Sequence, residues 1–172
     1  MYVLHFLYCK LVVVSAASKD HYAESQDMID SVQKFLPNTK LIVYDLGLTR
    51  KQKEKLHRYC NVEVRPFKFK NYPPHTKSLM TYAWKPLIIN EVTSRYEVIF
   101  WGDSSVRLKG VSFAEKLFPF LLKFPFVAGS VLDLPIISLT HDGMLKYLNL
   151  SLSRRQMGHF GHLEAGCWVI IS

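Results

Sequence analysis

An acid and two hydroxyl residues follow directly after an apolar run in the middle of the chain. The run is Val98-Ile99-Phe100-Trp101, and four such side chains in a row are typical of a strand buried on both faces. It ends at Gly102-Asp103-Ser104-Ser105. An open α/β sheet binds its ligand at the carboxyl ends of its strands, where an aspartate beside hydroxyls can hold a divalent cation and, through it, a phosphate. A second interpretation is that Asp103 only caps the next turn, and the motif alone leaves both open.

The elements that would position Asp103 begin with a β-branched run. Leu11–Val14 predicts the first strand, and Ser15-Ala16-Ala17-Ser18 predicts a small-residue turn that lets a ligand approach the backbone. Apolar residues at helical spacing then predict a helix over 22–36, which ends at Pro37.

Further strands and helices alternate along the chain. We expect strands over 41–44, 62–67, 98–101, 126–128 and 167–171, and helices over 50–60, 77–96, 113–124 and 141–150. The 62–67 strand should lie near an edge because it contains Pro66. Pro86 should break or restart the 77–96 helix and leave Lys85 in an extended or turn conformation. The alternation predicts the α/β class, with a Rossmann-like, mostly parallel sheet and helices on both faces.

The charge balance favours anionic partners. The chain has 172 residues, 22 Lys and Arg against 14 Asp and Glu, and a net charge of +8. Nucleotides, phosphates, nucleic acid and acidic glycans all suit such a balance, which does not choose among them. Nucleic acid is the weakest of these, because the basic residues are scattered and form no stripe with aromatic residues.

The cysteines and the apolar segments exclude two classes of protein. Cys9, Cys60 and Cys167 are odd in number and far apart, so we expect free thiols rather than a zinc site or a disulfide framework. The apolar first eighteen residues are interrupted by His5 and Lys10, and no stretch is long and clean enough to be a membrane span.

The order of these motifs resembles the nucleotide-sugar-binding half of glycosyltransferases with the GT-A fold. Those begin with a strand that ends in a small-residue loop, here Val13–Ser18, and carry an acid-x-acid motif after a later strand, here Asp103-Ser104-Ser105. A Lys-Pro pair often precedes that strand, here Lys85-Pro86, and a small-residue turn opens a later one, here Glu164-Ala165-Gly166. The segments 31–47 and 97–107 also resemble an uncharacterised animal family of glycosyltransferase-like proteins. The likeness covers roughly 11–171, and we expect residues 1–172 to form a single GT-A-like domain that lacks its C-terminal part.

This resemblance implies a nucleotide site across the ends of the first and central strands. Ala16, Ala17 and Ser18 would face the base and ribose through their backbone groups. Tyr22 would stack on the base, although a core-facing aromatic at a helix start is an equal alternative. The ammonium of Lys85 would meet the diphosphate as a point charge, with a solvent-exposed lysine as the equal alternative.

The resemblance also implies a divalent cation, Mn²⁺, held by Asp103 and Ser105. Ser105 stands where the usual motif has its second acid, and a hydroxyl is a poorer cation ligand than a carboxylate. Three interpretations follow: Asp103, diphosphate oxygens and another residue hold the metal, the protein works without metal, or it is inactive. Glu164 would act as the catalytic base on an acceptor hydroxyl or orient the sugar.

Four other polar residues have weaker signals. Asp45 could accept a ribose hydroxyl, but a turn-forming role is favoured. Arg107 could meet the diphosphate, although a lone arginine after a strand is more often structural. His159 and His162 could bind metal or acceptor, but surface histidines are the commoner case.

The predicted function is transfer of a sugar from a nucleotide-sugar donor to a hydroxyl of a glycan or protein acceptor. A catalytically inactive GT-A-like binding protein or fragment is the alternative. The resemblance places the protein in the Golgi or another secretory lumen, with any targeting segment outside this chain, and with neither nucleic acid as partner nor a membrane span.

Overall fold

The computed structural model describes residues 10–110, 119, 121, 123–135, 141–147, 149 and 161–171, without the side chains of 129–135 and 161–165. Within it the chain divides into two compact units, Met1–Val127 with Gly166–Ser172, and Ala128–Ala165. Among the described helices, none has the length and apolar character needed to cross a membrane.

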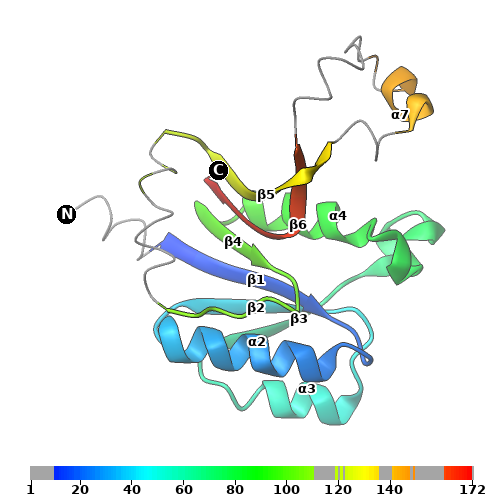
Figure 1. Cartoon of the computed structure of the whole chain (residues 1–172). Coiled ribbons are helices and arrows are strands. Elements are labelled where there is room, and N and C mark those ends of the chain that lie inside the picture. Colours follow the sequence, from blue (N-terminus) through cyan, green and yellow to red (C-terminus); the bar gives the residue numbers. More distant parts are fainter. Residues whose placement is uncertain are drawn as a thin grey trace. The chain divides into compact units, whose positions relative to one another are not determined.

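A six-stranded, mostly parallel sheet carries the fold (Figure 1). Its order is β3-β2-β1-β4-β6-β5, in which β1 pairs parallel to β2 and β4, β2 pairs parallel to β3, and β4 pairs antiparallel to β6. The predicted α/β class is therefore confirmed. The strands are β1 Leu11–Ala17, β2 Lys40–Asp45, β3 Val62–Pro66, β4 Val98–Gly102, β5 Phe126–Pro135 and β6 Gly161–Ile171.

Strand β1 is longer than its β-branched run. The prediction that Ser15–Ser18 forms a turn is wrong for its first three residues, because Ser15, Ala16 and Ala17 continue the strand opposite Val43–Asp45 of β2. All seven residues of β1 are buried, since neighbouring strands flank it on both edges and helices cover both faces. Small side chains here suit a crowded strand, and the turn begins only at Ser18.

Helices cover the two faces of the sheet (Figure 1). Helix α2, Tyr22–Phe35, and helix α3, Arg50–Leu56, lie on one face, and α4, Trp84–Thr93, lies on the other. The core beneath α2 contains Val13, Met28, Ile29, Val32 and Phe100, each no more than 1% exposed. Because successive strand residues point to opposite faces, Ile99 and Trp101 are buried on the α4 side.

Three short 3-10 turns connect β3 to α4, and the third of them lies where the 77–96 helix was expected to begin. They are η1 Phe69–Asn71, η2 Pro74–Lys77 and η3 Leu79–Thr81. Pro86 lies in the first turn of α4, where its missing N–H costs no intrahelical bond, so the helix restarts at Trp84 as the proline rule allows. Lys85 is therefore helical, and the prediction of an extended or turn conformation is wrong.

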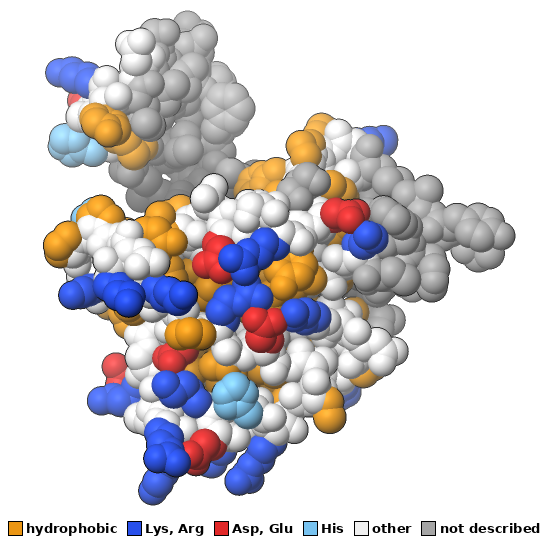
Figure 2. Space-filling view, turned by 180° about the vertical axis from the view of Figure 1, so that it is seen from behind, with side chains coloured by type: hydrophobic (Ala, Val, Ile, Leu, Met, Phe, Trp, Pro, Cys, Tyr) orange, Lys and Arg blue, Asp and Glu red, His pale blue; other side chains and the backbone are white. Residues whose placement is uncertain are grey.

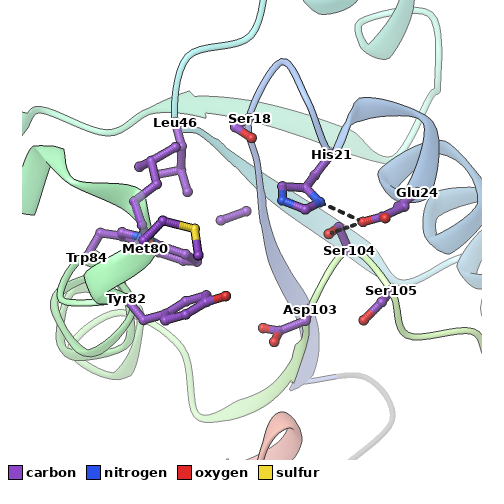
Figure 3. A pocket seen from close by; sticks show the side chains of 12 residues that line it. Ser18, His21, Glu24, Leu46, Met80, Tyr82, Trp84, Asp103, Ser104 and Ser105 are labelled. Carbon is purple, nitrogen blue, oxygen red and sulfur yellow. Dashed lines mark hydrogen bonds and ion pairs between the residues drawn. The ribbon is translucent and has the colours of Figure 1, made fainter.

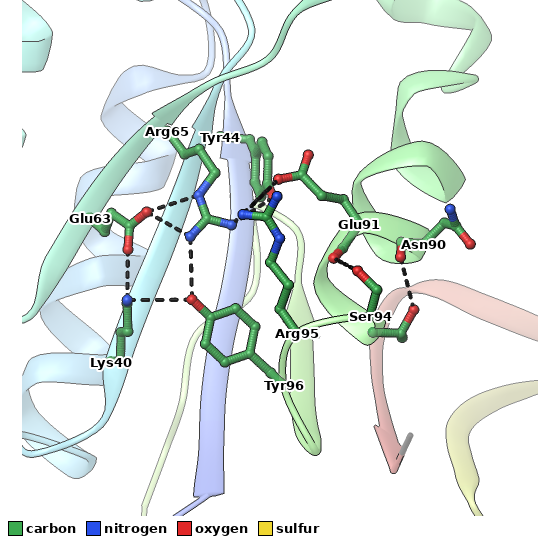
Figure 4. Close-up of polar contacts among 10 residues, drawn as sticks. Lys40, Tyr44, Glu63, Arg65, Asn90, Glu91, Ser94, Arg95 and Tyr96 are labelled. Carbon is green, nitrogen blue, oxygen red and sulfur yellow. Dashed lines mark hydrogen bonds and ion pairs between the residues drawn. The ribbon is translucent and has the colours of Figure 1, made fainter.

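A polar network on the face of the sheet that α4 covers connects the edge strand β3 to this helix (Figure 4). Arg65 donates to Glu63 at 2.6 and 2.8 Å, to the Tyr44 hydroxyl at 3.1 Å and to the Tyr96 hydroxyl at 3.3 Å, and it pairs with Glu91 of α4 at 3.6 Å. Burial raises the pKa of Tyr44 to about 12 although Arg65 opposes the shift, so this phenol stays protonated at neutral pH. The network stabilises β2, β3 and α4 around one guanidinium.

The remaining predicted elements fall partly outside the described residues. Of the 113–124 helix only 119, 121, 123 and 124 are described. Residues 158–160 of the expected loop 158–162 lie outside the described part, and the loop prediction is wrong for Gly161 and His162, which begin β6. The predicted helix over 141–150 appears as α7, Asp142–Tyr147. Helix α3 ends at Leu56, four residues earlier than expected, and Thr49 with Gln52 forms its capping box.

Candidate functional site

A pocket of about 330 Å³ lies at the carboxyl ends of β1, β2 and β4 (Figure 3). Three kinds of segment line it: the end of β1 with the start of α2, the turn η3 with the start of α4, and the residues after β2 and β4. The lining residues are Ala16, Ser18, His21, Glu24, Leu46, Leu79, Met80, Tyr82, Trp84, Asp103, Ser104 and Ser105.

The first strand brings two of its predicted ligand-facing residues to this pocket. Ala16 and Ser18 line it, whereas Ala17 is 1% exposed and belongs to the core on the opposite face of β1. Tyr22 is also a core residue and does not line the pocket, which favours the core alternative over stacking on a base. Its hydroxyl is buried, has no hydrogen-bond partner among the described residues, and its pKa is raised by burial.

Asp103 lies directly after β4, and its carboxylate is held from two sides. Lys85 Nζ lies 2.8 Å from Oδ1 and 2.9 Å from Oδ2, and Trp101 Nε1 donates to Oδ1 at 2.7 Å. The Asp103 backbone N–H donates to the Gly166 carbonyl of β6 at 2.8 Å, so this strand fixes the backbone as well. The prediction of a turn at Glu164-Ala165-Gly166 is wrong, because these three residues are part of β6. The carboxylate is thus oriented before any ligand arrives.

Lys85 pairs with Asp103 but is not one of the residues that line the pocket. Its side chain is 10% exposed, and its ammonium lies 5.5 to 5.9 Å from the ring centroids of Tyr82, Trp84 and Trp101. Aromatic faces attract cations and offset part of the cost of burying one. The structure therefore places Lys85 as a buried counter-charge to Asp103, and the solvent-exposed alternative does not apply.

The sequence reasoning missed a cluster on the α2 side of the pocket. His21 Nδ1 lies 2.8 Å from Glu24 Oε2, and the Ser104 hydroxyl donates to the same oxygen at 3.4 Å (Figure 3). An imidazole held by a carboxylate can accept a proton or bind a ligand hydroxyl. The signal was present, because His21 and Glu24 are three residues apart at a helix start and therefore share one face.

The described residues offer few ligands for a divalent cation. Both Asp103 oxygens already accept hydrogen bonds, and Ser105 supplies only a neutral hydroxyl. Among the residues that the structure describes, no three His, Cys, Asp or Glu side chains are grouped to hold a metal ion. These residues therefore do not fit a metal site of their own, and a cation here would take most of its ligands from bound phosphates.

Asp45 has the turn-forming role that its sequence favoured. Its Oδ1 accepts from the backbone N–H groups of Gly47 at 2.8 Å and Leu48 at 2.6 Å, and Lys53 lies 3.1 Å from Oδ2. Burial alone would raise the pKa of Asp45, but these three contacts outweigh it and lower the pKa. The residue does not line the main pocket.

Arg107 anchors the turn after β4 rather than facing the pocket. It donates to the Ser104 carbonyl at 2.6 Å and to Asp27 of α2 at 3.0 Å. Glu164 lies in β6, but its side chain is outside the described part, as is that of His162, and His159 is not described at all. Cys60 and Cys167 are free, and Cys9 is not described.

Comparison with known proteins begins with a partial family match. A family described as "Protein of unknown function (DUF1647)" matches residues 8–90, which is just under half of the chain. No curated protein matches the chain.

Solved structures are similar to this chain at the level of the fold. The galactosyltransferase LgtC in complex with donor and acceptor sugar analogs is 15% identical with a TM-score of 0.57, over 92% of this chain and 57% of that one. The bifunctional glycosyltransferase WbbM is 15% identical with a TM-score of 0.60, over 94% of this chain and 31% of that one. Core-mannan synthase A of Aspergillus fumigatus, in its Mn/GDP form, is 7% identical with a TM-score of 0.51, over 94% of this chain and 59% of that one.

The chain spans between about a third and three fifths of the length of these three structures. At such low identity the likeness concerns the fold alone. The order of the strands, the small-residue end of β1 and the acid after β4 agree with it. The chain has the GT-A fold of the nucleotide-diphospho-sugar transferases.

Proposed function

We propose that this chain is the donor-binding part of a glycosyltransferase, which transfers a sugar from a nucleotide-sugar donor to a hydroxyl of a glycan or protein acceptor. The observation that carries the proposal is the pocket at the ends of β1 and β4, where Ala16, Ser18 and Asp103 meet. Its volume of about 330 Å³ lies within the range of small-molecule sites, and ligands of open α/β sheets bind at this edge.

The proposed donor would lie along the small residues of β1. Ala16 and Ser18 would let its base and ribose approach the backbone, and Ala17 would support them from the core. The diphosphate would lie toward Asp103, whose charge Lys85 offsets. Without that ammonium, the Asp103 carboxylate would repel a phosphate. Lys85 would therefore favour diphosphate binding indirectly, by neutralising the charge of Asp103.

Sugar transfer also needs a base on the acceptor hydroxyl and a counter-charge for the leaving diphosphate. Glu164, which lies in β6, is the proposed base, because the resemblance implies a base or a sugar-orienting acid at this position. A bound divalent cation, Mn²⁺ by analogy with the Mn/GDP form of core-mannan synthase A, would neutralise the leaving group. Asp103, Ser105 and the diphosphate oxygens would hold it. A Golgi or other secretory lumen is the proposed location.

The test is nucleotide binding by the 172-residue chain. Thermal unfolding is followed with UDP, GDP and CDP and their sugars, each with Mn²⁺ and with EDTA. A ligand at about 100 times its Kd adds about 2.7 kcal/mol, and a chain of this size gains about 2–4 °C per kcal/mol, so one nucleotide should raise Tm by about 5–10 °C.

The matched variants are Asp103→Asn, which should abolish that shift, and Asp27→Asn, which should retain it. Both remove a carboxylate that pairs with a cation, but only Asp103 lines the pocket. A flat response to every nucleotide and nucleotide sugar contradicts the proposal.

The alternative is a GT-A-like protein that binds its ligand without catalysis. Two observations favour it: Ser105 replaces an acid, and Lys85 already occupies both oxygens of Asp103. Release of the nucleoside diphosphate from a bound nucleotide sugar separates the two functions. Binding without release, over hours and with a mixture of glycan acceptors, would favour the binding protein.

A further inference from the structure

The segment between β3 and α4 is basic and contains no acid. From Pro66 to Asn90 the chain has four lysines and one histidine, and neither Asp nor Glu. Lys85 pairs with Asp103. Lys68, Lys70 and Lys77 are exposed, and none of them forms an ion pair with a residue that the structure describes.

This segment has a packed scaffold of its own. The ring of Phe67 stacks on Tyr72 with centroids 5.2 Å apart and meets Phe69 edge-on at 4.7 Å. Thr76 is 2% exposed, and its hydroxyl donates to the Pro73 carbonyl at 2.8 Å. The lysines therefore project from turns fixed by buried side chains, which reduces the entropy lost when they bind a partner.

The same segment continues into the mouth of the pocket. Leu79, Met80 and Tyr82 line the pocket, yet Met80 is 80% and Tyr82 55% exposed. The backbone of Tyr82 has φ 53°, a left-handed conformation that a bulky residue rarely adopts. Residues with such backbone conformations cluster at active sites and ligand clamps, and Figure 3 shows the Tyr82 ring pointing into the pocket.

We propose that the acceptor is an anionic glycan that docks along this segment. Its sulfate or carboxylate groups lie on Lys68, Lys70 and Lys77, and a sugar ring at the pocket mouth packs on Tyr82. Figure 2 shows several groups of Lys and Arg side chains on the face seen from behind, with hydrophobic side chains between them, so this face as a whole offers cations to an anionic partner. This inference rests on the proposed function, because it takes the pocket as the donor site.

The arrangement of aromatic rings favours a glycan over single-stranded nucleic acid. Nucleic-acid grooves offer several exposed rings on which successive bases stack. Here Phe67 stacks on Tyr72 and meets Phe69 edge-on, all three rings are buried or half-buried, and Tyr82 is the exposed ring of the segment. One ring beside a charged row suits one sugar followed by acidic substituents.

The experiment measures binding of a heparin-derived sulfated oligosaccharide to the 172-residue chain at 150 mM salt, against the desulfated, N-acetylated oligosaccharide of equal length. The triple variant Lys68→Gln/Lys70→Gln/Lys77→Gln should weaken binding about tenfold, since exposed ion pairs contribute little individually but act together here. The matched control is Lys51→Gln/Lys55→Gln/Arg58→Gln on and beside α3, which removes the same charge from exposed positions and should bind as the wild type. Tyr82→Ala should weaken binding several-fold without changing its salt dependence.

Three results would overturn the inference: equal weakening by the control variant, equal binding of the desulfated oligosaccharide, or tighter binding of an RNA or a poly-glutamate peptide of the same charge. The nucleotide-induced shift in Tm is measured in parallel. Loss of glycan binding with an unchanged shift in the triple variant supports the acceptor assignment. A normal shift with no glycan binding in the wild type refutes that assignment alone, whereas no shift with any nucleotide refutes the proposed function.

Discussion

Replacing Asp103 by asparagine should destabilise the protein by about 2–3 kcal/mol. The change leaves the Lys85 ammonium, whose side chain is 10% exposed, with a neutral partner. Breaking a buried ion pair costs about 3–5 kcal/mol when the remaining charge has no compensation. The cost is lower here because the amide oxygen still accepts one bond, because water reaches Asp103, which is 30% exposed, and because three rings surround the ammonium.

The reciprocal change, Lys85→Met, should cost less, about 1–2 kcal/mol. Methionine fills the volume of the lysine stem among Tyr82, Trp84 and Trp101. The Asp103 carboxylate keeps the Trp101 N–H at 2.7 Å and is exposed enough to be hydrated. Asp103→Asn should therefore be the more destabilising of the two, and the double variant should cost about 1–2 kcal/mol less than the sum of the single ones.

The assay is urea unfolding at pH 7 and 25 °C, with the free energy of unfolding compared at equal m-values. Asp27→Asn serves as the control, because its pair with Arg107 is exposed at 71% on the carboxylate side and should contribute less than about 0.5 kcal/mol. The reasoning is refuted if Lys85→Met is the more destabilising change. It is also refuted if Asp27→Asn costs as much as Asp103→Asn.

Three further predictions concern single positions. Ser105→Asp restores the usual second acid at an exposed position, so the ratio of nucleotide affinity in Mn²⁺ to that in EDTA should rise about tenfold over the wild-type ratio. Calorimetric titrations that give the wild-type ratio for this variant would contradict the prediction. Asp45→Asn should lower the free energy of unfolding at pH 7 by about 1–2 kcal/mol. Because the folded pKa of Asp45 lies below its usual value of 3.8, this difference should be complete above pH 3.8 and shrink as the pH falls through the folded pKa, and a constant difference in acid titrations would contradict it. Tyr22→Phe removes a buried hydroxyl that has no partner among the described residues, so the free energy of unfolding should stay equal or rise by up to about 1 kcal/mol. Nucleotide affinity should not change, and weaker nucleotide binding by this variant would indicate that Tyr22 contacts the ligand.

The sheet could be predicted because its central strands leave little choice. The β-branched run at Leu11–Val14 and the apolar run at Val98–Trp101 are both too apolar for anything but a buried strand, and the structure has them side by side as β1 and β4. The end of β1 could not be predicted, because Ser15–Ala17 has the composition of a turn. Only the presence of neighbours on both edges and both faces makes those residues strand.

The contact between Lys85 and Asp103 could not be predicted from the sequence, for a different reason. It depends on where α4 begins, and the apolar spacing of Leu79, Met80 and Leu87 suggested a helix that started several residues earlier. Pro86 was correctly expected to restart that helix. Because a proline is tolerated within the first turn of a helix, α4 begins two residues before Pro86, and Lys85 is therefore helical and buried. The left-handed Tyr82 has no sequence signal, since it is neither glycine nor asparagine.

The charges around the pocket suggest why its ligand needs more than the described side chains. Asp103 is balanced by Lys85 and Glu24 contacts His21, so the described lining carries no surplus of positive charge. A nucleoside diphosphate brings several negative charges, and transfer leaves them on the departing group. The positive charge must therefore arrive with the ligand as a cation, or come from residues outside the described part. The acid-free segment beside the pocket raises the local potential, but its residues Leu79, Met80 and Tyr82 that line the pocket are neutral, which suits the segment to the acceptor rather than to the diphosphate.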